Sequence, residues 1–253
     1  MFQHAAVLRH RGIFSDVREA FWKQEPQIKT VLASLTAPRV FIVPLFISEG
    51  YFGDDIIPRE LGFCLSNEAD SRFVLQGSRT TNYAHPIGTH PRMAEVILAR
   101  AKEVLERFPF PRVPKLKGTT LFIAGHGTGR NERSREAIER QAHLIRAREI
   151  YADVKAVFME EEPRIHGCLS LAQSRNVVMV PFFASDGLHV VEDIPLMLGE
   201  PERIVKQRLA AGQPTWRNPT ERDGKLIWYS SAVGTHPAVV EVILERVCEC
   251  ASL

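Results

Sequence analysis

Three side chains that commonly bind metal ions follow three apolar segments in the C-terminal half of the chain. His126 stands in GHGT directly after TTLFIAG, Glu160 follows DVKAVFM, and His189 lies in ASDGLHVVEDIP after NVVMVPFF. Imidazole nitrogens suit Co, Ni, Fe and Zn, and a carboxylate adds a harder ligand or a base. The pattern indicates a divalent-metal site with open coordination positions, although the same three residues could also be a purely structural set.

The segments before these residues are predicted to be strands of one sheet. TTLFIAG and NVVMVPFF are apolar throughout, as is typical of parallel strands covered on both faces. ERSREAIERQAHLIRAREIY has apolar residues at helical spacing, and we expect further helices over PRIHGCLSLAQS and HPAVVEVILERVCE, the last with Thr235 as N-cap. Alternating strands and helices predict an α/β fold with a doubly wound parallel sheet. Since ligands bind beyond the carboxyl ends of such strands, His126, Glu160 and His189 should meet there.

The chain also contains a long internal repeat. VPLFISEGYFGDDIIP (43–58) matches VPFFASDGLHVVEDIP (180–195) at an offset of 137, and YAHPIGTHPRMAEVILARA matches YSSAVGTHPAVVEVILERV at an offset of 146. We therefore predict two tandem doubly wound domains, residues 1–108 and 118–253, related by duplication. The Pro-rich residues 109–117 are the expected linker.

The two copies differ where chemistry is expected. AVLRHRG aligns with LFIAGHGT, which sets His10 opposite His126, while Lys23 stands opposite Glu160 and Phe52 opposite His189. One metal site is therefore predicted, in the second copy. His90 and His236, in the GTHP of each copy, are predicted to have a structural role because the motif occurs in both.

The composition excludes several function classes. The chain has 253 residues, 25% of them charged and 45% hydrophobic, and its net charge of +2 is too small to indicate a nucleic-acid surface. Four Cys without a C-x-x-C pair argue against a cysteine-based zinc site and suit a reducing cytoplasm. The sequence has no signal-peptide pattern and no apolar run long enough for a membrane span. Without a P-loop or G-x-G-x-x-G motif, no ATP or nucleotide is expected.

GHGT, VFMEEEP and VPFFASDGLHVVEDIP together resemble the CbiX family of sirohydrochlorin chelatases, ATP-independent relatives of ferrochelatase. The GLHVVEDIP portion is the most specific, and the first copy matches more loosely. The resemblance implies two chelatase-like domains that bind a tetrapyrrole, and insertion of Co²⁺, Fe²⁺ or Ni²⁺ into sirohydrochlorin. The divalent metal is then a substrate.

Site residues follow from the same resemblance. It implies that His126 and His189 bind the metal, with Glu160 as the acidic partner. The adjoining Glu161 and Glu162 are alternative matches for this acidic residue. Because the substrate carries many carboxylates, Arg130, Thr128 and Ser185 are expected to bind it. The nearby Arg133 and Arg135 either join them or lie on a solvated helix face.

Two alternatives stay open at this point. A degenerate relative could be a non-catalytic carrier or sensor of a tetrapyrrole or metal, and a different tetrapyrrole such as a porphyrin could be the substrate. Neither a nucleic acid nor a membrane is an expected partner. An internal duplication can replace a homodimer, so a monomer or a weak homo-oligomer is expected.

Overall fold

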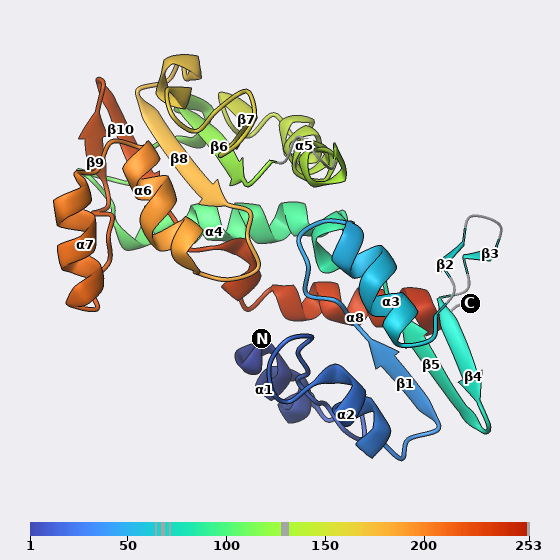
Figure 1. Cartoon of the computed structure of the whole chain (residues 1–253). Helices are drawn as coiled ribbons and strands as arrows, with labels where there is room; N and C mark the ends of the chain where they lie inside the picture. Colours follow the sequence, from blue (N-terminus) through green and yellow to red (C-terminus); the bar gives the residue numbers. More distant parts are fainter. Residues whose placement is uncertain (64, 67–68, 71, 128–131, 252–253) are drawn as a thin grey trace. The chain divides into compact units, whose positions relative to one another are not determined.

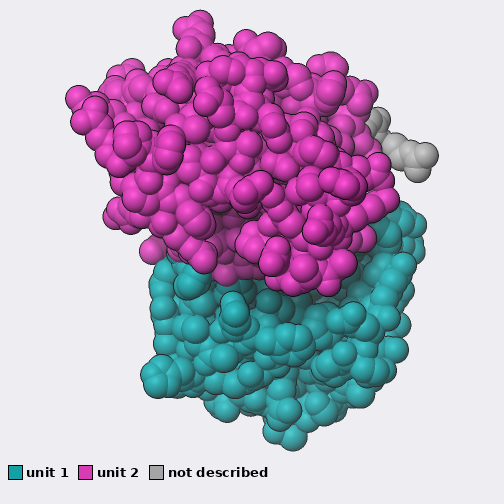
Figure 2. Space-filling model, turned by 90° about the vertical axis from the view of Figure 1, so that its left-hand side faces the viewer, with its two compact units in different colours: residues 1–90, 237–253 teal, residues 91–236 magenta. Residues whose placement is uncertain are grey.

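The computed structural model of the chain describes residues 1–63, 65–66, 69–70, 72–127 and 132–251. It divides into two compact units, shown in Figure 2. Unit 1 comprises residues 1–90 and 237–253, and unit 2 comprises residues 91–236. Both units are α/β, as the sequence predicts (Figure 1). None of the helices in the described ranges is long and apolar enough to cross a membrane.

Unit 2 is built on a five-stranded sheet of order β7-β6-β8-β10-β9. All neighbouring strands are parallel except the pair β9–β10 at one edge. The strands are β6 (Thr119–Gly125), β7 (Asp153–Phe158), β8 (Asn176–Pro181), β9 (Thr220–Arg222) and β10 (Lys225–Tyr229). Every residue of β6 is buried, which confirms that this continuously apolar strand is central. The antiparallel edge strand β9 was not predicted.

Helices and short helical turns surround this sheet. The longer ones are α4 (Met93–Arg107), α5 (Glu132–Arg146) and α7 (Glu202–Ala210). The shorter ones are η3 (Leu116–Gly118), η4 (Cys168–Leu171), the π-helix η5 (His189–Asp193), α6 (Ile194–Met197) and η6 (Val233–Thr235). The helix expected over PRIHGCLSLAQS is wrong except for η4, because Gly167 adopts a left-handed conformation (φ 87°) that interrupts it.

Unit 1 has a smaller sheet of order β1-β5-β4, in which β1 and β5 are parallel and β4 is antiparallel. Its strands are β1 (Arg39–Ile42), β4 (Phe73–Gln76) and β5 (Arg79–Tyr83), with a separate hairpin of β2 (Leu65–Ser66) and β3 (Ala69–Asp70). Its helices are α1 (Phe2–Arg11), α2 (Ile28–Ser34), the π-helix η1 (Tyr51–Ile56), α3 (Ile57–Glu60), η2 (Ile87–Thr89) and α8 (Val239–Ala251).

The last helix of each sequence copy belongs to the unit built by the other copy. Helix α4 follows the first GTHP but packs on β8 and β10 in unit 2, and α8 follows the second GTHP but packs on α1 and η2 in unit 1. The compact units therefore divide the chain differently from the boundaries 1–108, 109–117 and 118–253. Those boundaries stay a prediction about the duplicated sequence. The expected cap is wrong, because Thr235 ends η6 and lies four residues before the first residue of α8.

The alignment of His10 with His126 is also wrong. Residues 5–10 form part of helix α1, whereas LFIAG belongs to strand β6. The offset of 137 instead continues to the start of the chain: Arg9 Nε donates to the carbonyl of Val17, as Arg146 Nε does to that of Val154. Helix α1 therefore matches the second half of α5.

Unit 1 differs from unit 2 at the segment that matches β7. Residues 16–21 form no strand, and only Phe21 makes an isolated bridge, to Gln27. In the described part of unit 1, β1 is an edge strand.

Candidate metal-binding site

The sheet of unit 2 brings three predicted residues to one edge. Strand β6 lies between β7 and β8, and the three strands end almost level, since Gly125 pairs with Phe158 and Ala124 pairs with Pro181. The backbone N–H groups of Met159 and Glu160 both donate to the carbonyl of His126. The loops that carry His126 and Glu160 are thereby joined directly at the carboxyl ends of the strands.

Both glycines beside His126 are required by close packing. A Cβ on Gly125 would lie 2.0 Å from Cδ1 of Ile138 in helix α5. Gly127 has a φ of 66°, and its Cβ would lie 2.6 Å from Oε1 of Glu161. Only glycine allows α5 and the loop after β7 to approach this closely, and the positive φ of Gly127 makes the turn after His126 tight.

The ring of His126 presents one nitrogen to its neighbours. Its Nδ1 lies 2.8 Å from the carbonyl oxygen of Gly127, and since a carbonyl can only accept, Nδ1 carries the proton. Nε2 therefore has a free lone pair in the neutral ring, and it lies 3.7 Å from Oε1 of Glu160. About a third of this histidine side chain is exposed, so an ion or substrate atom can reach it.

His189 lies next to His126, and its Nδ1 is likewise held by an oxygen atom. The two ring centroids are 5.0 Å apart at an interplanar angle of 75°. Nδ1 of His189 lies 2.6 Å from Oδ2 of Asp193, one helical turn further along η5. Donation of the Nδ1 proton to this carboxylate leaves Nε2 as the free ligand atom. Asp193 was missed in the sequence, although its spacing of four residues from His189 is the signal that could have found it.

The neighbouring acids have other partners. Oε2 of Glu161 pairs with Arg135 at 3.4 Å, and the carbonyl of Glu162 accepts a hydrogen bond from the same guanidinium. Of the three consecutive glutamates, Glu160 is the one that lies beside an imidazole of the site. Arg135 also pairs with Glu139 and lies over the ring of Phe158, so it packs against α5 and β7 instead of extending freely.

The predicted substrate-binding residues are less well defined. Thr128 and Arg130 lie outside the described residues, and Ser185 is exposed in the loop after β8. Within the described ranges, no three His, Cys, Asp or Glu side chains converge closely enough to hold a metal ion together. An ion that binds the two imidazoles would therefore keep open coordination positions, unlike an ion in a closed structural site.

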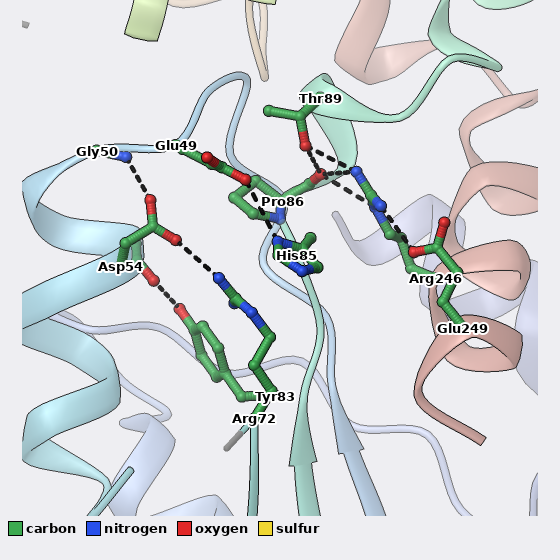
Figure 3. A network of polar contacts seen from close by, with 11 residues as sticks. Glu49, Gly50, Asp54, Arg72, Tyr83, His85, Pro86, Thr89, Arg246 and Glu249 are labelled. Carbon is green, nitrogen blue, oxygen red and sulfur yellow. Dashed lines mark hydrogen bonds and ion pairs between the residues drawn. The ribbon is translucent and has the colours of Figure 1, made fainter. Parts of the chain in front are cut away.

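Unit 1 has different side chains at the equivalent positions. Lys23 and Phe52, which match Glu160 and His189, lie near each other, with Nζ of Lys23 5.8 Å from the Phe52 ring centroid. Nearby, Nδ1 of His85 lies 3.3 Å from Oε1 of Glu49, and Asp54 pairs with Arg72 (Figure 3). Burial raises the pKa of Asp54 above its ordinary value. This half of the molecule thus keeps polar contacts at the strand ends without the pair of imidazoles.

Comparison with known proteins identifies the family. The CbiX family model matches residues 1–104 and 120–250. A protein of Halobacterium salinarum named "Probable sirohydrochlorin cobaltochelatase" is 39% identical over 98% of this chain and 84% of its own length. A "Sirohydrochlorin cobaltochelatase" of Methanopyrus kandleri is 29% identical over 51% of this chain and 94% of its own length.

A solved structure agrees with this assignment. A multi-domain protein of Deinococcus radiodurans, described as structurally similar to chelatases, superposes on 98% of this chain with a TM-score of 0.77 and 29% identity. This chain spans half the length of that protein. The fold, the paired histidines at its strand ends and the match over both copies lead to one conclusion: the chain belongs to the CbiX family.

Proposed function

We propose that this protein is a sirohydrochlorin chelatase that inserts a divalent metal ion into metal-free sirohydrochlorin without ATP. Co²⁺ is the metal substrate that we propose. The observation that supports this most strongly is the pair of adjacent imidazoles at the ends of β6 and β8, of which Nε2 of His126 lies 3.7 Å from Glu160. The names of the relatives point to cobalt. Fe²⁺ and Ni²⁺ are the competing substrates that the experiments should include.

The chemistry of metal insertion fits these three side chains. The ion must lose water ligands as four pyrrole nitrogens bind it, and two pyrrole N–H protons must leave. In the proposal, Nε2 of His126 and of His189 binds the arriving ion and leaves its other positions exchangeable. Glu160, more than half exposed and 3.7 Å from His126, accepts a proton and passes it to solvent.

Variants of the two histidines test this function. We expect His126→Ala and His189→Ala each to slow Co²⁺ insertion by about 10- to 100-fold, because one ligand of the arriving ion is lost. The reaction is followed anaerobically by the visible spectrum of sirohydrochlorin, with the rate in the absence of protein subtracted. His143→Ala is the matched control, since His143 is exposed on α5.

Three outcomes separate the possibilities. A wild-type protein no faster than the uncatalysed reaction would refute the chelatase function, and binding of sirohydrochlorin without turnover would identify a carrier. Variants that metallate as fast as wild type would refute the assignment of His126 and His189. Rates measured with Co²⁺, Fe²⁺ and Ni²⁺ in parallel determine the preferred metal.

A further inference from the structure

Unit 1 carries a compact group of aromatic rings around one lysine, formed by Trp22, Lys23, Tyr51 and Phe52 and called here the Trp22 cluster. The centroids of Trp22 and Phe52 are 4.9 Å apart, and those of Tyr51 and Phe52 are 5.5 Å apart. Nζ of Lys23 lies 4.5 Å from the Trp22 centroid. The rings contact one another directly, so the cluster is one surface.

The cluster lies where the fold usually binds ligands. At the offset of 137, Lys23 and Phe52 match Glu160 and His189 of the candidate metal site. The local backbone is conserved between the units, since the bridge between Phe21 and Gln27 repeats that between Phe158 and Arg164. The Trp22 cluster therefore follows β1 and residues 16–21, at the edge of the sheet where an α/β fold presents its ligand-binding loops.

The exposure of these rings is not explained by packing. Tyr51 is 63% exposed and Phe52 48%, whereas large aromatic side chains in the cores of both units are almost fully buried. Lys23 is exposed too, and none of the described carboxylates lies within ion-pair distance of it. A cation for which no described carboxylate is a counter-ion, beside flat apolar faces, is complementary to a ligand that is itself flat and negatively charged.

We propose that the Trp22 cluster is a binding subsite for the macrocycle, where the rings of Tyr51 and Phe52 contact its flat face and Lys23 pairs with a peripheral carboxylate. The identity of this ligand rests on the proposed function, because sirohydrochlorin is both flat and polyanionic. In this proposal the first sequence copy has side chains that bind the organic substrate at the positions where the second copy has metal-binding chemistry. Specificity for carboxylated tetrapyrroles resides partly in Lys23.

Equilibrium binding of metal-free sirohydrochlorin tests this subsite. We expect Lys23→Gln and Phe52→Ala each to raise the Kd about 5- to 20-fold in isothermal titration calorimetry, performed anaerobically without metal. The matched controls are Lys117→Gln and Phe110→Ala, which change an exposed lysine and an exposed phenylalanine of unit 2 and should leave the Kd unchanged. In steady-state metallation, Lys23→Gln should raise KM with little change in kcat.

The outcomes distinguish this inference from the proposed function. If wild type binds and metallates sirohydrochlorin while Lys23→Gln and Phe52→Ala bind it with wild-type affinity, the subsite is refuted and the function stands. If affinity depends on Lys23 and Phe52 but wild type shows no metallation, the subsite stands and the chelatase function is refuted. A wild-type protein that binds no sirohydrochlorin refutes both. Unchanged circular dichroism spectra and melting temperatures show that the variants are folded.

Discussion

The pair His189–Asp193 determines which nitrogen of the imidazole is available. An isolated neutral histidine exchanges its proton between Nδ1 and Nε2, and its ring rotates. With Nδ1 2.6 Å from Oδ2 of Asp193, both the tautomer and the ring orientation are set. Orienting partners of this kind change metal affinity by about 10- to 100-fold in metal sites. Asp193 is thus a positioning residue in the proposed reaction.

Removal of the Asp193 carboxylate should weaken binding of the metal ion and leave binding of sirohydrochlorin unchanged. We expect Asp193→Ala to raise the Co²⁺ concentration that gives half-maximal rate by about 10-fold, while the KM for sirohydrochlorin stays the same. Rates at varied Co²⁺ and fixed macrocycle provide the measurement. Glu192→Gln, one residue away, is the control. A change in the macrocycle KM alone would contradict the positioning role.

At this scale the sequence predicted the pattern better than the details. His126 lies beside Glu160 and also beside His189, because neighbouring strands of a parallel sheet end almost level. Asp193 was missed because no helix was expected over residues 189–193, so its spacing of four residues from His189 was not used. His10 was misplaced because a short similarity between AVLRHRG and LFIAGHGT outweighed the longer register that α1 shares with α5.

The π-helices η1 and η5 are tied to their sheets by equivalent tyrosines. Tyr229 at the end of β10 donates its hydroxyl hydrogen to the carbonyl of Val190 at 2.6 Å, and Tyr83 at the end of β5 does the same to Gly53 at 2.8 Å. Burial raises the pKa of Tyr229 well above its ordinary value. Because Val190 follows His189 directly, this bond also supports the position of the imidazole.

Tyr229→Phe should destabilise the protein and slow the reaction. Loss of the hydroxyl leaves the Val190 carbonyl without this donor and should lower the free energy of unfolding by about 1–2 kcal/mol in urea titrations. The metallation rate should fall several-fold. Tyr83→Phe is the matched variant: it should cost similar stability in unit 1 and leave the rate constant for metallation nearly unchanged. Equal rate losses in both variants would contradict a local effect on His189.

Tyr229→Phe should also change how the free energy of unfolding depends on pH in alkaline solution. The folded-state pKa of Tyr229 is raised, so the folded protein keeps a proton that the unfolded chain releases above about pH 10. The stabilisation from the protonated tyrosine is complete below that pH and is lost as the pH rises above it. The decline of unfolding free energy above pH 10 should therefore be shallower in Tyr229→Phe than in wild type.

Elements were predicted well where burial alone decides them. The strands β6, β7 and β8 and the helices α5 and α8 follow from apolar content and periodicity. The packing of α4 and α8 on the unit of the other sequence copy was not predictable. A helix that packs on its own copy would need the same apolar face, so the sequence pattern does not distinguish the two arrangements. The short strands β4 and β9 form only as hairpin partners of β5 and β10, so their own residues carry little signal.

In the whole molecule, each exchanged helix is fixed to its unit by a buried arginine. Arg246 of α8 donates to the carbonyl of Pro86 and to Oγ1 of Thr89 in unit 1 (Figure 3). Arg100 of α4 donates to the carbonyl of Ala232 and to Oγ1 of Thr235 in unit 2. The two sets match at the offset of 146, so the duplication kept both anchors.

Each arginine should stabilise the unit in which its helix packs. It should not stabilise the unit that is built by the rest of its own sequence copy. Hydrogen bonds from a charged donor are worth about 1.5–3 kcal/mol when buried acceptors depend on them. We therefore expect Arg246→Ala to lower amide hydrogen-exchange protection by about 2–3 kcal/mol in β1 and β5, with β8 and β10 much less affected. Arg100→Ala should show the reverse pattern.

The two variants are controls for each other, and Arg140→Ala, at an exposed position of α5, should change neither pattern. Exchange rates followed by mass spectrometry on peptides from the four strands give the measurement. If Arg246→Ala lowered protection in β8 and β10 as much as in β1 and β5, the protein would unfold as one cooperative body. The exchanged helices would then link the stabilities of the two units instead of fixing each one separately.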